Sequence, residues 1–278
     1  MSLIMIKFKD LKNSVTLISI VFCFLFAGAA LAADPVKNSR RPAPFVGTDL
    51  QKLTCRGARI PFGPFDYRDR AKFQGELFIT EEYHLTPEIL QLQQATTTAA
   101  INDIQYTLMA WPNHPQALYA AYEYRLKRNR GEFSRSINAP SPVECHLQRA
   151  IKFSPNDPVP YMILGMLMHE FEHYDTALKS YRKANALLPN DVITLYNMGL
   201  TLVALERYEE AMMVAQEVYS TDFPLPGLKK KLANAGHWGE PNTKDTKETS
   251  EEVTNQLNET EQSEAPLQNG DADLAVIR

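Results

Sequence analysis

The sequence predicts an all-α protein in which helix–turn–helix repeats stack into a solenoid, flanked by segments that do not belong to the repeats. Three observations predict this fold. The chain is self-similar at a period of 34 residues, its apolar residues recur at helical spacing, and small residues occur where two helices must cross. Gly165 recurs as Gly199, and Tyr174 recurs as Tyr208, in each case one period later.

Composition and charge agree with a globular protein. The chain has 278 residues, of which 44% are hydrophobic and 22% charged, values typical of folded domains. It carries 29 Lys and Arg against 33 Asp and Glu, a net charge of −4. This balance excludes a strongly basic nucleic-acid binder, and residues 33–238 taken alone are close to neutral.

Residues 1–32 have the pattern of an export signal. Three lysines precede an apolar run from Val15 to Phe26, and Ala30-Leu31-Ala32 matches a cleavage site before Ala33. The run is shorter than the roughly 20 residues that span a bilayer as a helix. We expect an exported, periplasmic protein without a membrane span after cleavage; the alternative is an inner-membrane anchor formed by an uncleaved signal.

Residues 33–80 do not follow the repeat. A Pro-rich polar stretch, 34–44, is expected to be a linker. An ordered loop is expected around Phe62, Phe65 and Tyr67, where aromatic residues alternate with turn formers, and a short strand or extended stretch over 75–80. We expect this segment to pack on the solenoid.

The repeats resemble the tetratricopeptide repeat (TPR) family. The unit 158–191 carries nearly the full family pattern, namely Tyr161, Leu164, Gly165, Tyr174, Ala177, Tyr181, Ala184 and Pro189. The next unit, 192–225, departs from it late, with Ala215 where an aromatic residue is usual and Phe223 where proline is usual. The resemblance extends to a group of exported bacterial TPR proteins of unassigned function, and it implies a binding scaffold.

Two further units are predicted before residue 158, giving three clear repeats and one degenerate repeat within the solenoid, 81–238. The third clear unit has a first helix from Pro115 to about Leu126 and an insertion of nine residues, which is expected to form an enlarged turn before Pro155. The degenerate unit precedes it, around Ala100 and Ile104. A closing helix, residues 225–235, is expected to cap the last unit.

The resemblance also implies a binding groove, because the first helix of each TPR repeat lines the concave side. By phase, the groove residues are Gln116, Tyr119, Glu123, Met162, Met166, His169, Tyr196, Asn197 and Leu200. This set is apolar and aromatic with few cations, so we expect it to bind a protein or peptide with apolar side chains rather than an acidic chain terminus. The runner-up hypothesis is that the groove is filled by the chain's own N-terminal segment.

One motif favours a competing function. His169-Glu170-Phe171-Glu172-His173 matches H-E-x-x-H, which binds zinc when both histidines lie on one face of a continuous helix. The repeat register instead places the motif across the turn between two helices. We therefore expect no enzyme, metal or cofactor, with a zinc-dependent hydrolase as the alternative.

Cys55 and Cys145 are the two cysteines downstream of the predicted signal. In an exported chain such a pair favours a disulfide, which would link the N-terminal segment to the second helix of a repeat. The alternative is two unpaired thiols. Residues 239–278 contain ten acidic and three basic residues and no aromatic residue, so we expect a disordered acidic tail.

Overall fold

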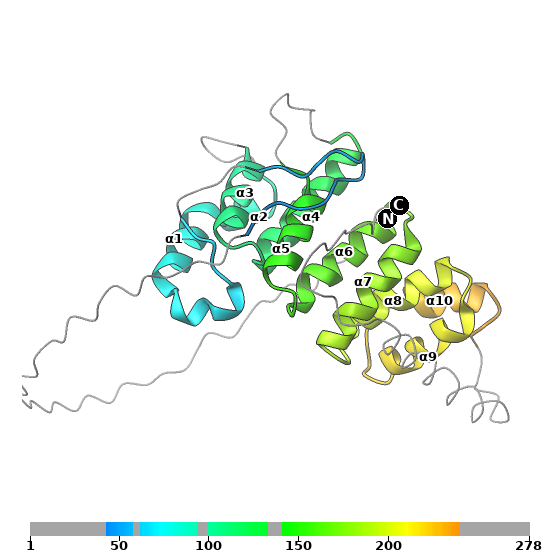
Figure 1. The fold of residues 1–278 in the computed structure, drawn as a ribbon. Helices are drawn as coiled ribbons and strands as arrows, with labels where there is room; N and C mark the ends of the chain where they lie inside the picture. Colours follow the sequence, from blue (N-terminus) through cyan, green and yellow to red (C-terminus); the bar gives the residue numbers. More distant parts are fainter. Residues whose placement is uncertain (1–42, 58–61, 94–98, 133–140, 239–278) are drawn as a thin grey trace, which may run out of the picture. The chain divides into compact units, whose positions relative to one another are not determined.

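The computed structural model describes residues 43–57, 62–93, 99–132 and 141–238 (Figure 1). Within these ranges the chain forms one short 3-10 helix and ten α-helices: η1 (Tyr67–Lys72), α1 (Gln74–His84), α2 (Pro87–Leu90), α3 (Ala100–Ala110), α4 (Pro115–Asn129), α5 (Val143–Phe153), α6 (Pro158–Glu170), α7 (Tyr174–Leu187), α8 (Val192–Ala204), α9 (Tyr208–Tyr219) and α10 (Gly227–Asn234). The described residues contain no strand, only an isolated antiparallel bridge between Thr48 and Thr54. The predicted all-α class is therefore confirmed for this part of the chain.

The period of the sequence is also the period of the helices. α8 begins and ends one period after α6, and α9 begins one period after α7. Each helix packs against the next, so that α6, α7, α8 and α9 lie side by side (Figure 1). α10 lies within residues 225–235, where the closing helix was predicted, and it packs on both α8 and α9.

Polar side chains start the first helix of each pair. The Asp157 carboxylate accepts a hydrogen bond from the Val159 amide (3.0 Å) at the start of α6, and Asp191 accepts one from Thr194 (2.8 Å) at the start of α8. His114 holds the same position before α4. Such N-caps satisfy amide groups that have no partner inside the helix, which explains why these helices begin where they do.

The same helices end alike. Glu172 (φ 62°) and Glu206 (φ 58°) adopt the left-handed conformation just after α6 and α8. The next amide then bonds back to the last turn, as from His173 N to Met168 O (2.8 Å). α4 and α10 end in the same way, with a glycine at the left-handed position. This Schellman geometry closes the four helices sharply, and after α6 and α8 it leaves a short turn to the next helix.

Glycines allow two close helix crossings, as the sequence predicts. A Cβ on Gly165 would lie 2.7 Å from the Tyr181 ring of α7. In the next unit the residue equivalent to Tyr181 is Ala215, and Leu228 of α10 fills the space instead, 2.5 Å from a Cβ built on Gly199. The last unit thus needs α10 to complete its core.

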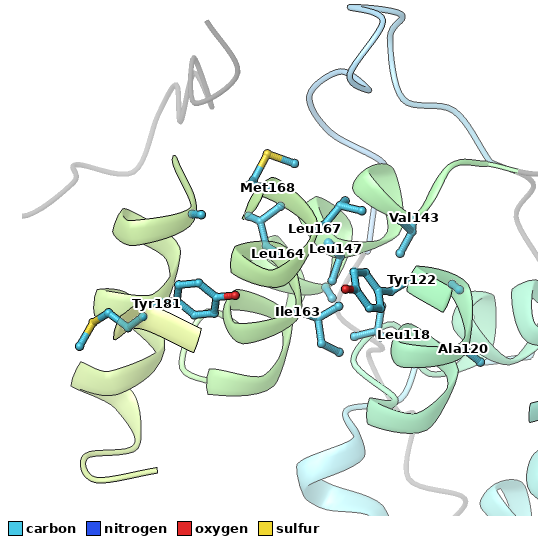
Figure 2. Close-up of a cluster of buried hydrophobic side chains, with 14 of the residues drawn as sticks. Leu118, Ala120, Tyr122, Val143, Leu147, Ile163, Leu164, Leu167, Met168 and Tyr181 are labelled. Atoms are coloured by element: carbon cyan, nitrogen blue, oxygen red, sulfur yellow. The ribbon is translucent and has the colours of Figure 1, made fainter. Parts of the chain in front are cut away.

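A further part of the core joins α6 to the helices before it (Figure 2). Tyr122 of α4, Leu147 of α5 and Ile163 of α6 meet there, and each is at most 3% exposed. Because α5 and α6 belong to different units, these contacts bury the apolar face of one unit against its neighbour.

The segment 75–80 is helical, so the expectation of an extended stretch is wrong. It forms the first half of α1, where the buried Thr80 hydroxyl donates to Glu76 O (2.7 Å) and accepts from Trp111 Nε1 (3.2 Å). Leu77 packs on the same side, one helical turn before Thr80. A run of adjacent apolar residues favours a strand by pattern, but only a helix brings these two side chains to Trp111.

Aromatic residues pin the loop before η1, as predicted. Phe65 is 3% exposed and lies 4.9 Å, centroid to centroid, from Trp111 at the end of α3. Phe62, Tyr67 and Phe73 surround this pair. This part of the N-terminal segment therefore packs on the helical array.

A disulfide joins Cys55 to Cys145 on α5, with 5.3 Å between the Cα atoms, which confirms the predicted pairing. The segment 43–57, named the strap below, is thereby fixed to the outer side of α5. Side chains of α5 also hold its backbone. Gln148 donates to Thr48 O (2.7 Å), and Arg149 donates to Ala43 O (2.7 Å).

Several expectations concern residues outside the described ranges. These are the export signal, most of the linker, part of the insertion (133–140) and the acidic tail. Among the described residues, no helix combines the length and the hydrophobicity needed to span a bilayer.

Candidate functional site

The predicted groove residues lie on three neighbouring first helices. α4 packs against α6, and α6 packs against α8. We call the surface that these residues form the α4–α6–α8 face; its members are Gln116, Tyr119, Glu123, Met162, Met166, His169, Tyr196, Asn197 and Leu200. All are half-buried except Gln116, which is exposed.

Equivalent positions of the face align from helix to helix. Tyr119, Met162 and Tyr196 share one phase of the repeat. One helical turn later, Glu123, Met166 and Leu200 share the next phase. Since residues four apart lie on the same side of a helix, the face presents rows of half-exposed, mainly apolar side chains across three helices.

On α4 the face combines an aromatic ring with an acid. The Tyr119 hydroxyl donates to Glu123 Oε1 (3.1 Å), and its ring centroid lies 5.7 Å from that of Tyr122. Burial raises the pKa of Tyr119, and the adjacent Glu123 carboxylate adds to the increase. Tyr119 is therefore a neutral phenol at physiological pH, held in place by its own helix.

On α6 the histidine of the face connects two helices. His169 Nδ1 lies 2.9 Å from the Thr201 hydroxyl of α8. That hydroxyl donates its proton to Asn197 O (2.9 Å), so Nδ1 carries the proton and donates to Thr201. Burial and then the positive charge of Lys231 lower the pKa of His169, so the ring is neutral at pH 7.

On α8 the end of the face is covered by the C-terminal part of the array. The Phe223 ring lies 5.0 Å from the Tyr196 ring, and the amides of Gly227 and Leu228 hydrogen-bond the Tyr196 hydroxyl. Tyr196 is therefore a partner of α10. The open part of the face lies on α4 and α6 and on α8 around Leu200.

A second tyrosine completes this contact. The Tyr219 hydroxyl of α9 accepts from Lys229 N (3.1 Å) and donates to Leu225 O (2.8 Å). α10 has Pro226 at its N-cap, without a side-chain hydrogen bond of its own. Phenol groups of the preceding unit thus replace the polar residue that begins α4, α6 and α8.

One acidic residue beside the face has a raised pKa. Burial raises the pKa of Glu170 at the end of α6; Arg130 opposes this increase and Glu123 adds to it. The two carboxylates therefore repel each other across α4 and α6. Together they give the face a negative rather than a positive end.

The H-E-x-x-H motif is split by a turn, as the register predicts. α6 ends at Glu170, and the chain reverses at Glu172 before His173 starts α7. His173 is exposed, whereas His169 faces α8. This break removes the i, i+4 arrangement that zinc binding by the motif requires. In the described ranges, no group of three or more His, Cys, Asp or Glu side chains is placed to hold a metal ion.

A buried polar network is centred on Asp66. The Asp66 carboxylate accepts from Asn113 Nδ2 (2.8 Å), the Ser154 hydroxyl (2.6 Å) and Arg68. Burial alone would raise the pKa of Asp66, but the hydrogen bonds from Arg68, Ser154 and Asn113 outweigh it and hold that pKa well below its usual range. Asp66 thus ties together the loop before η1 and the two turns after α3 and α5. Ser154 donates to a carboxylate and not to a histidine, so the network has a structural role.

No family model matches the chain, and a search of curated proteins finds no match. In the part of the chain that the structure describes, the fold is all-α, and the helix pairs α6–α7 and α8–α9 repeat with the period of the sequence.

Proposed function

We propose that this chain is a non-enzymatic scaffold of the TPR type that binds an apolar segment of a protein partner on the α4–α6–α8 face, in the bacterial cell envelope. One observation carries the proposal: phase-equivalent residues of three neighbouring helices remain half-exposed, although each has at least one buried neighbour in the chain. TPR resemblance in the sequence supports the same conclusion.

The chemistry of the face defines the partner. Met162 and Met166 are flexible and polarizable, so they adapt to differently shaped apolar side chains. Tyr119 adds a rigid aromatic surface with a hydroxyl that its own helix already engages. An amphipathic helix or extended peptide with an apolar side therefore suits the face. The runner-up occupant is the N-terminal segment, but its described part packs on α5 and Trp111.

The disulfide supports the proposed location. Disulfides persist in oxidising compartments such as the periplasm and are rare in the cytosol. The pair Cys55–Cys145 thus agrees with the export signal expected from residues 1–32.

Photo-crosslinking in the envelope tests the proposal. A photoreactive side chain at Tyr119 or Met166 is expected to give crosslinks to another protein. The matched control is Lys183, which is exposed on α7. A probe at Tyr196 is expected to crosslink mainly within the chain, because Phe223 covers it. Equal yields at Lys183 and Met166 would contradict binding at the face.

A further inference from the structure

Helix α1 carries a second, separate apolar surface. Phe78, Ile79 and Tyr83 are 60%, 46% and 65% exposed. Their spacing along the helix places them on one side of α1. The opposite side packs on α3 through Thr80 and His84, whose ring contacts Tyr106 at 4.1 Å. α1 therefore leaves large apolar side chains exposed on its outer side, away from the side that packs on α3.

A hollow adjoins these side chains. It has a volume of about 350 Å³, and its lining residues come from α1 and the start of α2: Phe78, Glu81, Glu82, Leu85, Thr86 and Pro87. Phe78 belongs to both the exposed apolar row and the hollow. An apolar side chain of a partner that enters the hollow would contact this ring together with Leu85 and Pro87.

The surroundings are acidic. Between Phe73 and Tyr124 the chain has six Asp or Glu residues and no Lys or Arg. Glu82 and Glu88, both exposed, belong to this stretch, and Glu82 also lines the hollow. Glu81, Glu82 and Glu88 thus give the hollow an acidic edge, whereas Arg68, Arg70 and Lys72 of η1 precede α1.

We propose that the outer side of α1, with the adjoining hollow, binds a basic amphipathic segment of another protein. Large apolar side chains that stay exposed together mark interaction sites, and an acidic rim selects a partner with Lys or Arg beside its apolar residues. This site is separate from the α4–α6–α8 face, so it does not depend on the function proposed above.

The chain's own basic stretch is a poorer occupant. Residues 33–42 include Lys37, Arg40 and Arg41, which match the charge of the rim. Apart from prolines and Ala33, Val36 is the only apolar residue among them. The stretch therefore lacks a large apolar side chain that could fill the hollow. Residues 33–42 therefore cannot supply the apolar half of the recognition.

A labelled amphipathic peptide of Leu and Lys is the probe, and fluorescence anisotropy measures its affinity for the chain starting at Ala33. Phe78→Ser and the pair Glu82→Lys, Glu88→Lys are each expected to weaken binding about tenfold. Matched controls on α9 are Met213→Ser, which removes another exposed apolar residue, and Glu209→Lys, which changes an exposed acid. Both controls are expected to bind as the parent does.

The outcomes separate the occupants. Raising the salt from about 0.05 M to about 0.5 M is expected to weaken binding, because surface charges are screened. Three results would overturn the proposal. The affinity for the peptide is unchanged by the α1 substitutions, it falls by the same factor in the α9 controls, or a peptide of Leu and Glu binds as tightly as the peptide of Leu and Lys. A dimer that Phe78→Ser dissociates would assign the surface to a second copy, and tighter binding after deletion of residues 33–42 would assign it to the chain itself. Either result overturns the proposal, while crosslinking at Met166 is unaffected by both.

Discussion

Helices α5 and α7 hold the same place in successive units, yet the outer side of α5 is buried and that of α7 faces solvent. Cys145, Gln148 and Arg149 of α5 are at most 4% exposed. The residues one period later are Lys179, Arg182 and Lys183 of α7, which are exposed or half-buried. The strap covers α5, and no described segment covers α7 in this way.

The difference shows which contacts the side chains of a helix need when another segment covers them. Lys183 is compatible with water and needs no partner, whereas a charged Arg149 in the interior must be hydrogen-bonded. Arg149 meets this need through the carbonyls of Ala43, Leu108 and Met109. The outer side of a repeat helix can thus become interior, provided that the covering segment supplies acceptors and is held in place.

The largest expected effect comes from removing the disulfide. Replacing both Cys55 and Cys145 by Ala should lower the free energy of unfolding by about 4–5 kcal/mol, because the bond closes a loop of 90 residues in the unfolded chain. Urea unfolding of the parent with and without reductant measures the effect. The double variant is the control and should not respond to reductant; equal midpoints for parent and variant would contradict the prediction.

A smaller loss is expected at Arg149. Arg149→Met should lower the free energy of unfolding by about 2–4 kcal/mol, because it leaves buried carbonyl groups without donors. The equivalent change on α7, Lys183→Met, should remain within about 0.5 kcal/mol, since that residue is exposed. Both are measured by urea unfolding. Similar losses in the two variants would show that the strap does not create the difference between the helices.

The pH dependence of stability should also separate the two helices. Both ring nitrogens of His146 on α5 are buried without a hydrogen-bond partner. Burial and then the charge of Arg149 lower its pKa to about 3. Below pH 6.5 the unfolded chain therefore takes up a proton that the folded chain does not, and stability falls as the pH falls.

Between pH 7 and pH 5 this histidine should remove about 2 kcal/mol of stability. Unfolding of His146→Phe at both pH values measures the contribution, since phenylalanine cannot be protonated and still packs on Phe45. His173→Gln, at the exposed start of α7, should keep the slope of the parent. A slope that persists in His146→Phe would assign the effect to other groups, with His169 the first to test.

The sequence was sufficient to predict the helices and their phase where the structure repeats. The helices α6 to α9 and the phase of Met162 and Tyr196 follow from the sequence period, because neighbouring units set each other's register. The pairing of Cys55 with Cys145 followed from the cysteine count and the expected compartment.

What the sequence did not predict depends on contacts between distant segments. The cysteine pair predicted a link between the N-terminal segment and α5, but the sequence did not predict that residues 43–57 would bury Gln148 and Arg149. The helical state of α1 depends on Trp111, which lies 31 residues after Thr80. Tyr196 matched the groove by phase, but α10, outside the repeat, takes up its hydroxyl.

The pair of phenols at α10 has a consequence for the length of the array. In the preceding unit the positions of Tyr196 and Tyr219 hold Met162 and Asn185, which offer no phenol to the start of a following helix. A segment like α10 grafted after α7 would therefore find neither its hydrogen-bond partners nor the gap beside Gly199 that Leu228 fills. The two tyrosines and the missing aromatic ring at Ala215 thus fit this unit, and not the one before it, to be followed by a helix such as α10.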